Sequence, residues 1–305
     1  MILAHPQFFT REHFEARKGS APAELCELVV HCLELVSQLA HRGLDFRFKG
    51  GNSLLVLLED PQRFSIDVDI VTTVKKDELI QLVESVAREC SAFDRWEVRQ
   101  PKTKPWLPML SFKLFFRSQY QPEHEAYVML DAVLKPPPYT GVRRPVRCAD
   151  IYQSPLEVEV PSISGLIGDK LLTLGPSTLG IPLGKAKEAQ RLKHVFDVAL
   201  LARTGYELED VRSSVRGCIE QELEIQGRSM TWPEIRSDTR RFCSAALTHR
   251  ERPDPSTLEG GTYLSEIALG FEAFRTHLFQ IEYDWTMLRD DFSRILALLD
   301  ELDAV

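Results

Sequence analysis

The chain has 305 residues, of which 44% are hydrophobic and 27% charged, with a formal net charge of -8. This composition is ordinary for a globular protein built from one large domain or two compact ones. Proteins that coat nucleic acid are usually basic, so any contact with nucleic acid has to be local. No apolar run approaches the roughly 20 residues that span a bilayer. The six cysteines lack a paired CxxC spacing, which is typical of free thiols in a reducing compartment. We therefore expect a cytoplasmic protein without a membrane span.

The first half of the chain alternates between helix and strand signals. Apolar periodicity predicts helices over 24–41 and 77–90, and a short helix over 52–58 with Asn52 as its N-cap. Alternating patterns predict strands over 46–48, 65–71, 96–99, 109–117 and 126–134. The three prolines at 136–138 cannot continue a ladder, so we expect them to end the strand series.

After Ser162 strand signals vanish. Helices are predicted over 163–174, 188–203, 208–226, 233–247, 263–277 and 283–302. The stretch 175–184 contains three glycines and two prolines, which favours a flexible loop. The pattern predicts an α+β protein: a mixed α/β core over 1–160, followed by an all-helical domain over 161–305.

Two aspartates stand one step apart on a predicted strand. Asp67 and Asp69 share one face of that strand, while Ile66, Val68 and Ile70 form its apolar side. Paired carboxylates repel unless a positive charge separates them, and Mg²⁺ prefers such oxygen ligands. The alternative is a solvent-facing pair on an edge strand. Asp131 lies within the apolar strand 126–134 and would complete a three-carboxylate site if that strand lies beside 65–71.

A second motif precedes the aspartates. In the segment 49–53, Lys-Gly-Gly-Asn-Ser, the glycines Gly50 and Gly51 let the backbone approach a phosphate closely, and Ser53 adds a hydroxyl donor. A Gly-Gly turn before a helix also occurs without any ligand. The order of the two motifs strengthens both, because a phosphate cradle followed by a DxD strand puts phosphate donors beside metal carboxylates.

Four motifs occur in an order that resembles the AbiEii/AbiGii-type (MenT-like) nucleotidyltransferases. These are toxins of abortive-infection and type IV toxin–antitoxin systems, within the polymerase β-like nucleotidyltransferase superfamily. The motifs are 48–54 (FKGGNSL), 63–69 (RFSIDVD), 168–172 (GDKLL) and 191–197 (RLKHVFD). The resemblance spans about residues 45–201. Asn52 departs from the Thr or Ser that is usual in the family.

The resemblance implies a role for each matching residue. Asp67 and Asp69 would ligate Mg²⁺ (or Mn²⁺), with Asp131 nearby. The nucleotide triphosphate would be held by Gly50, Gly51, Ser53 and Arg63. Lys170 would meet a phosphate and act together with Asp197, and both are expected to face the cleft between the two halves. The alternative for Asp197 is a surface ion pair with Lys193, four residues earlier.

The implied activity is transfer of a nucleotidyl group from an NTP to an acceptor that we expect to be RNA, such as the 3′ end of a tRNA. A separately encoded antitoxin protein would restrain such a toxin. One alternative is nucleotidylation of a protein or small molecule. A second is an inactive relative that binds nucleotide and regulates, although the intact Asp67, Asp69 and Lys170 argue against it.

An acidic enzyme that acts on RNA needs a local positive track. The candidates form three groups: Lys102, Lys104 and Lys113; Arg143, Arg144 and Arg147; and Lys185, Lys187, Arg191 and Lys193. We favour the third group, together with the loop 175–184, as the acceptor entrance, because it adjoins Lys170 and Asp197 in sequence.

Overall fold

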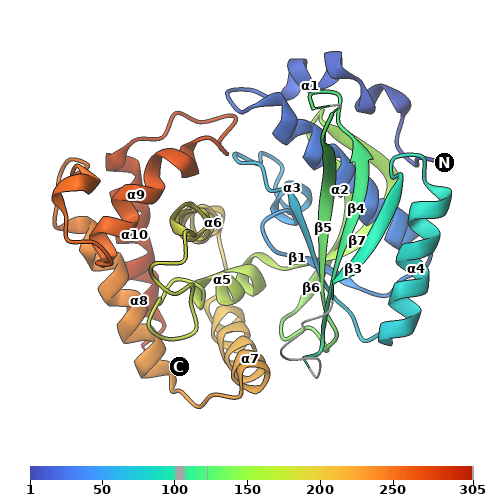
Figure 1. Ribbon diagram of the computed structural model, residues 1–305. Helices are drawn as coiled ribbons and strands as arrows, with labels where there is room; N and C mark the ends of the chain where they lie inside the picture. The colour runs from blue at the N-terminus through green and yellow to red at the C-terminus, as the bar shows by residue number, and fades with distance from the viewer. Residues whose placement is uncertain (100–106, 122, 304–305) are drawn as a thin grey trace. The chain divides into compact units, whose positions relative to one another are not determined.

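The computed structural model describes residues 1–99, 107–121 and 123–303. The backbone divides into two compact units. The first comprises Met1–Pro137, Gly141–Pro161 and His277–Gln280, and the second comprises Pro138–Thr140, Ser162–Thr276 and Ile281–Val305. The first unit is a mixed sheet with helices, and the second is helical, so the α+β class predicted from the sequence is confirmed (Figure 1).

A seven-stranded sheet forms the centre of the first unit. Its strands are β1 (Arg47–Lys49), β2 (Asp67–Val71), β3 (Arg95–Arg99), β4 (Met109–Arg117), β5 (Glu125–Val133), β6 (Gly141–Cys148) and β7 (Tyr152–Pro161). Their spatial order is β3-β4-β5-β2-β1-β7-β6. The β2–β5 and β1–β7 pairs are parallel, and the other neighbours are antiparallel.

Alternation along the strands gives the sheet one apolar and one polar face. Val68, Ile70 and Leu130 are fully buried on the apolar face, whereas the residues between them are half-buried or exposed. Helix α2 (Ala23–His41) packs against β2, β5, β6 and β7, and it also contacts α4 (Lys76–Glu89) (Figure 1). The polar face therefore carries the side chains available for chemistry.

The N-terminal segment adds structure that the sequence pattern did not predict. A 3-10 helix, η1 (Pro6–Phe9), leads into α1 (Arg11–Arg17), which packs on α2. Glu34 of α2, fully buried, accepts hydrogen bonds from the backbone N–H of Leu3 at 2.8 Å and from Tyr152 Oη at 2.8 Å. One buried carboxylate thus fastens the start of the chain to helix α2 and strand β7.

The expectation that the three prolines end the strand series is wrong. The hairpin of β6 and β7 follows them, and β7 joins the sheet beside β1. Pro145 is tolerated because β6 is an edge strand, and the register shifts between Pro145 and Arg147. The alternation of Val158 and Val160 with Glu157 and Glu159 was the available strand signal.

A short segment after helix α9 (Tyr263–Arg275), His277–Gln280, belongs to the first unit. Phe64 N–H donates to His277 O at 2.8 Å, Phe279 N–H donates to Gln62 O at 3.2 Å, and the rings of Phe64 and Phe279 stack with centres 4.1 Å apart. The helix predicted over 263–277 therefore ends earlier, at Arg275.

The second unit consists of helices in its described residues: α5 (Ile163–Leu171), α6 (Glu188–Thr204), α7 (Leu208–Gln226), α8 (Trp232–Leu247), the 3-10 helix η2 (Pro255–Thr257), α9 (Tyr263–Arg275) and α10 (Trp285–Glu301). Helix α6 contacts α5, α9 and α10, and α5 packs on α7. Within residues 1–99, 107–121 and 123–303, no helix has the length and apolar character of a membrane span.

The loop 175–184 is held by hydrogen bonds, contrary to the flexible loop predicted. Ser177 N–H donates to buried Asp238 Oδ2 at 2.7 Å, and Gly184 N–H donates to buried Glu266 Oε1 at 2.9 Å. Ile181 N–H donates to Thr173 O at 3.1 Å. Two carboxylates from distant helices therefore fix a segment whose glycines and prolines suggested freedom.

Acidification is expected to destabilise the first unit through His31 of α2. The ring is 7% exposed, stacks on Phe116 with centres 3.8 Å apart, and donates from Nδ1 to Glu27 O at 2.9 Å. Burial lowers the pKa of His31 from 6.5 to about 4. Between these values the unfolded state binds more protons, so the free energy of unfolding falls as pH drops.

Replacing His31 by Phe tests this effect, because the ring stack remains and the titration is removed. The loss of Tm between about pH 7 and about pH 5 should be smaller in His31→Phe than in the wild type. Burial also raises the pKa of Glu27, which acts in the opposite direction in both proteins and cancels in the comparison. Identical pH profiles would show that His31 does not limit acid stability.

Candidate functional site

The sheet register brings the predicted carboxylates together. Asp67 and Asp69 are alternate residues of β2, so they share a face, and β5 lies parallel beside β2 with Asp69 paired to Asp131. This is the polar face of the sheet, opposite Val68 and Ile70. Three carboxylates thus occupy neighbouring positions on two central strands, which is a costly arrangement without a positive partner.

Ser111 of β4, which the sequence analysis did not single out, orients Asp131. It pairs with Asp131 in the β4–β5 register, and its hydroxyl donates to Asp131 Oδ1 at 2.5 Å. This bond fixes the carboxyl group and directs it along the sheet face. The alternation of residues 109–117 indicated that Ser111 shares a face with Lys113, but only the pairing of β4 with β5 shows what it contacts.

Gly50 lies directly against Asp69. Its φ of +75° lies in the left-handed region, and a Cβ added there would overlap Asp69 Oδ2. Lys49, the preceding residue, pairs with Asp69 in the β1–β2 register. The backbone of the Gly-Gly turn and the second aspartate of the DxD pair are therefore neighbours, which is the close approach that the two motifs predicted.

Gly51 lies against Arg63. A Cβ on Gly51 would stand 2.6 Å from an Nη of Arg63 and 2.7 Å from Ser65 Oγ. Arg63 is 5% exposed, and its Nη1 donates to Phe64 O at 3.0 Å. The guanidinium is thus packed against the glycine turn, where a fixed cation suits an anionic ligand.

Ser53 and Asn52 differ from their predicted local roles. Ser53, not Asn52, is the N-cap residue of α3 (Leu54–Leu57), and its hydroxyl donates to Gly50 O at 2.9 Å. Asn52 is fully buried, and its amide has no hydrogen-bond partner among the described residues. With only four residues, α3 has a weak dipole, so an anion here would rely on backbone N–H groups of the turn and on Arg63.

The donors fit a hard divalent cation, because carboxylate oxygens are the ligands such ions prefer. The Asp69 carboxyl group packs directly against the Gly50 backbone, in the space that a Cβ would fill. Within the part of the chain that the structure describes, no group of three His, Cys, Asp or Glu side chains converges closely enough to hold a metal ion. The ligand set of Asp67, Asp69 and Asp131 therefore stays a prediction.

The charge of the DxD pair affects a cysteine of helix α2. Burial, followed by the charge of Asp67, raises the pKa of the Cys32 thiol well above its ordinary value. Cys32 Sγ donates to Ile66 O at 3.1 Å. All six cysteines are free and buried, and Cys32 is an unreactive thiol rather than a nucleophile.

Substitution of Gly50 by Ala should abolish most activity by displacing Asp69. The new methyl group cannot share space with Asp69 Oδ2, and the left-handed φ is unfavourable for alanine. We expect kcat to fall by at least about tenfold and the free energy of unfolding to fall by about 1–3 kcal/mol. Gly43→Ala is the matched control, because Gly43 has φ +74° and open space around its Cβ. Equal kcat in the two variants would contradict this placement.

In the second unit, Lys170 of α5 and Asp197 of α6 form a buried ion pair. Lys170 Nζ lies 2.8 Å from Asp197 Oδ2, and the side chains are 2% and 0% exposed. The alternative of a surface pair between Lys193 and Asp197 is therefore wrong as an account of Asp197. The ion pair fixes the position of both side chains and keeps their charges away from bulk solvent.

The basic group favoured as the acceptor entrance contains both buried and exposed residues. Arg191 is 1% exposed, pairs with Glu266 at 3.0 Å and donates to Ile181 O and Pro182 O at 3.0 and 3.1 Å. It fastens the loop 175–184 and is not available to RNA. Lys185 and Lys187 are exposed. Lys102 and Lys104 lie outside the described residues.

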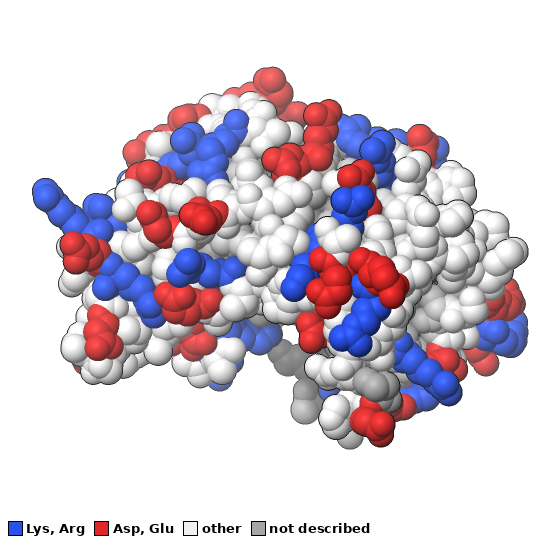
Figure 2. Space-filling model, turned by 90° about the horizontal axis from the view of Figure 1, so that it is seen from above, with Lys and Arg blue, Asp and Glu red and all other residues white. Residues whose placement is uncertain are grey.

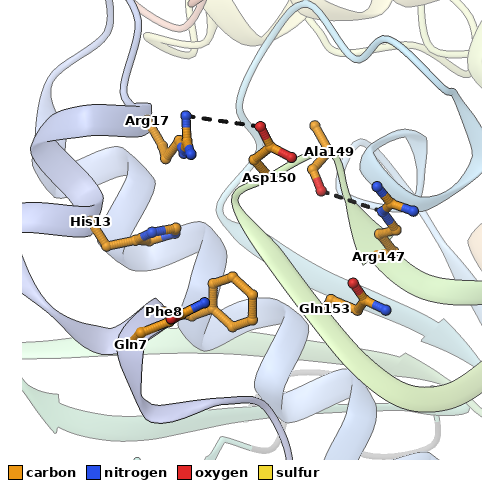
Figure 3. Close-up of a pocket in the computed structure, with 8 residues that line it drawn as sticks. All are labelled: Gln7, Phe8, His13, Arg17, Arg147, Ala149, Asp150 and Gln153. Carbon is orange, nitrogen blue, oxygen red and sulfur yellow. Dashed lines mark hydrogen bonds and ion pairs between the residues drawn. The ribbon is translucent and has the colours of Figure 1, made fainter.

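Charges are mixed over the face shown in Figure 2, where Lys and Arg side chains alternate with Asp and Glu. A pocket in the first unit is lined by Gln7, Phe8, His13, Arg17, Arg147, Ala149, Asp150 and Gln153 (Figure 3). Its polar groups bind one another: Arg17 lies 3.9 Å from Asp150, and Arg147 Nε donates to Ala149 O at 3.4 Å. This pocket lies between the N-terminal helices and the β6–β7 turn. It contains Arg147 of the second candidate basic group and none of the predicted nucleotide or metal ligands.

Comparison with known proteins identifies the family. The family model described as nucleotidyl transferase AbiEii toxin, type IV toxin–antitoxin system, matches residues 35–296. The chain belongs to this AbiEii family. It is accordingly a nucleotidyltransferase, and the match includes all four motifs of the sequence. A search of curated proteins found no match.

A solved nucleotidyltransferase toxin has a fold similar to that of this chain. MenT4, a nucleotidyltransferase toxin from Mycobacterium tuberculosis, matches with a TM-score of 0.53 and 17% identity over 94% of this chain and 97% of that chain. An antigenic nucleotidyltransferase-like protein from Paracoccidioides brasiliensis gives a TM-score of 0.42 and 13% identity over 72% of this chain and 93% of that chain. The likeness to MenT4 supports the fold.

Proposed function

We propose that this AbiEii-family enzyme transfers a nucleotidyl group from an NTP to an RNA acceptor with Mg²⁺ as its cation. The observation that carries the proposal is the β2–β5 register, which sets Asp69 beside Asp131 on the face where Gly50 adjoins Asp69. The carboxylates and the glycine turn come from separate strands, and together they offer oxygen ligands for a divalent cation and backbone donors for a phosphate.

The nucleotide would lie against the turn side of Asp69. Backbone N–H groups of Gly50 and Gly51 and the guanidinium of Arg63 offer donors to the triphosphate. The Ser53 hydroxyl bonds to Gly50 O and so supports the turn; it would have to rotate to bind phosphate itself. The β- and γ-phosphates leave as pyrophosphate, and these donors would stabilise its charge.

The carboxylates would hold the cation, which neutralises charge on the transferred phosphate and on the leaving group. Asp131, whose Oδ1 accepts from Ser111, keeps Oδ2 for a further partner. That oxygen is suited to accept the proton of the attacking acceptor hydroxyl. Lys170, held by Asp197 in the second unit, would contribute a positive charge to the phosphates.

RNA is the acceptor that we favour, with the 3′ end of a tRNA as one example. A separately encoded antitoxin, as the type IV toxin–antitoxin family implies, would restrain the enzyme. Transfer to a protein or a small molecule is the alternative outcome. Because the chain has a formal net charge of -8, RNA binding would depend on local cations and weaken with salt.

The experiment is to incubate the purified protein with each α-labelled NTP, Mg²⁺ and total RNA, and to separate RNA from protein. We expect label in RNA with one NTP preferred, and no label with Asp69→Asn. Label found only in protein would overturn the RNA acceptor while keeping nucleotidyl transfer. No incorporation from any NTP into any fraction would overturn the proposed activity.

A further inference from the structure

The polar face of the sheet continues beyond the carboxylates onto β5, β4 and β3. Below the row of Asp69, Asp131 and Ser111 lies a row of Asp67, Met129 and Lys113, because these residues pair in register. The next row contains Tyr127, Phe115 and Arg95. The candidate site therefore opens directly onto a surface of aromatic, thioether and cationic side chains.

Four side chains on this surface pack on one another in sequence. Lys113 Nζ lies 3.8 Å from the centre of the Tyr127 ring, and Tyr127 packs on Phe115 with ring centres 5.6 Å apart. The Arg95 guanidinium covers Phe115 at 3.5 Å from its centre. Tyr127 is a large side chain that is 39% exposed. Because Phe115 and Lys113 contact its ring, Tyr127 can serve as a stacking platform for a base. We use the word platform for Tyr127, its neighbours Phe115 and Lys113, and Arg95.

Charges on the platform differ in their availability. Arg95 is occupied, with Glu97 at 2.6 Å and Glu125 at 2.5 Å. Lys113 forms no ion pair with a described carboxylate, and its contact is the Tyr127 ring. Since the Lys113 ammonium lies over one face of the Tyr127 ring, binding would move the ammonium from the ring to a phosphate and leave that face to a base. This combination is the one that binds single-stranded nucleic acid.

The position of the platform indicates that it binds the acceptor rather than the incoming nucleotide. The glycine turn adjoins Asp69 from the β1 side of β2, whereas the platform begins at β5 on the other side. In an in-line displacement the attacking and leaving oxygens lie on opposite sides of the transferred phosphate. Phosphates held at the turn therefore leave the β5 side to the attacking strand.

We propose that Tyr127, Met129 and Lys113 bind the unpaired 3′-terminal segment of the nucleic-acid acceptor, with a base stacked on Tyr127 and a phosphate at Lys113. This inference rests on the proposed RNA acceptor. Tyr127 lies four residues from Asp131, about 13 Å along the strand. The stacked base therefore belongs to a nucleotide that precedes the reacting end, and duplex RNA without an unpaired end does not fit.

The test measures binding of a single-stranded RNA that carries 2-aminopurine near its 3′ end, without NTP, so that no transfer occurs. Binding to the wild type should quench the fluorescence, because the base stacks. Tyr127→Ala should bind roughly 5- to 150-fold more weakly, as expected for one lost base–aromatic stack, and lose the quenching. Tyr127→Phe should keep both. Binding of labelled NTP should be unchanged in each variant.

Lys113→Glu provides a second, independent variant. It should weaken binding and lower the slope of log K against log salt by about one, as expected for one phosphate contact. Arg88→Glu makes the same change of charge on α4, away from the platform, and should bind as the wild type does. Arg88 is an exposed residue whose neighbour is Glu89.

The outcomes separate this inference from the proposed function. Wild-type protein that labels and binds RNA, with Tyr127→Ala and Lys113→Glu unchanged in affinity and quenching, would overturn the platform alone. Equal affinity for a blunt hairpin and for its single-stranded counterpart would also overturn it. Wild-type protein that neither labels nor binds RNA would overturn both.

Discussion

Asp69→Asn is expected to reduce nucleotidyl transfer by at least about 100-fold while the protein stays folded. Asp69 pairs with Asp131 across β2 and β5, and its carboxyl group packs against the backbone of Gly50. A neutral amide keeps the shape of the side chain but removes the charge that binds a divalent cation. Several kcal/mol of transition-state stabilisation depend on that cation.

The same variant has a signature that does not require turnover. Without metal, Asp69→Asn should stay folded with a Tm close to that of the wild type, because the amide keeps the shape of the carboxylate. Adding Mg²⁺ or Mn²⁺ should raise the Tm of the wild type and not that of the variant, since only a ligand of the folded state stabilises it.

Asp150→Asn serves as the control for this comparison. Asp150 is an exposed aspartate of the same unit, in the β6–β7 turn, and its partner is Arg17 at 3.9 Å. It should keep both the activity and the metal-dependent rise in Tm. An equal metal-dependent rise in Asp69→Asn and the wild type would remove Asp69 from the proposed metal site.

Local patterns were sufficient to predict most elements of the sheet. Met109–Arg117 forms the strand predicted for it, because Leu110, Phe112 and Leu114 alternate with Ser111 and Lys113 over the first part of the segment. The common face of Asp67 and Asp69 also follows from alternation. The hairpin β6–β7 was missed because the arginines and Pro145 of an edge strand weaken the alternation that identifies buried strands.

Partners at long sequence separation could not be predicted. Nothing local indicates that Asp131 pairs with Asp69 or that Ser111 donates to Asp131, because register depends on which strands become neighbours. Arg191 shows the same limit. It lies in a basic stretch typical of a solvated surface. In the structure it is buried and donates a hydrogen bond to Glu266, which comes 75 residues later.

The second large effect is expected at the buried pair of the helical unit. Lys170→Met should lower the free energy of unfolding by about 3–5 kcal/mol, because Asp197 would remain charged and fully buried without its cation. The resemblance found in the sequence implied for Lys170 only that it meets a phosphate and acts together with Asp197. The 2.8 Å contact with Asp197 changes that expectation, since the ammonium already neutralises a buried carboxylate.

A double variant separates the two contributions of Lys170. Lys170→Met/Asp197→Asn removes both charges and leaves an amide oxygen as acceptor for the neighbours of residue 197. Its free energy of unfolding should return to within about 1–2 kcal/mol of the wild type, since neutral replacement of a buried pair is often tolerated. Denaturant titration measures this recovery, and coincident fluorescence and circular dichroism transitions check that the unfolding is two-state.

The restored double variant then tests the role in catalysis. If Lys170 supplies charge to the phosphates, the folded double variant should remain at least about 100-fold below the wild type in transfer, because the loss of charge is not repaired with the fold. Its affinity for NTP should fall as well. Wild-type turnover in a stable Lys170→Met/Asp197→Asn protein would establish the pair as a structural element of the α5–α6 contact and leave phosphate binding to Arg63 and the glycine turn.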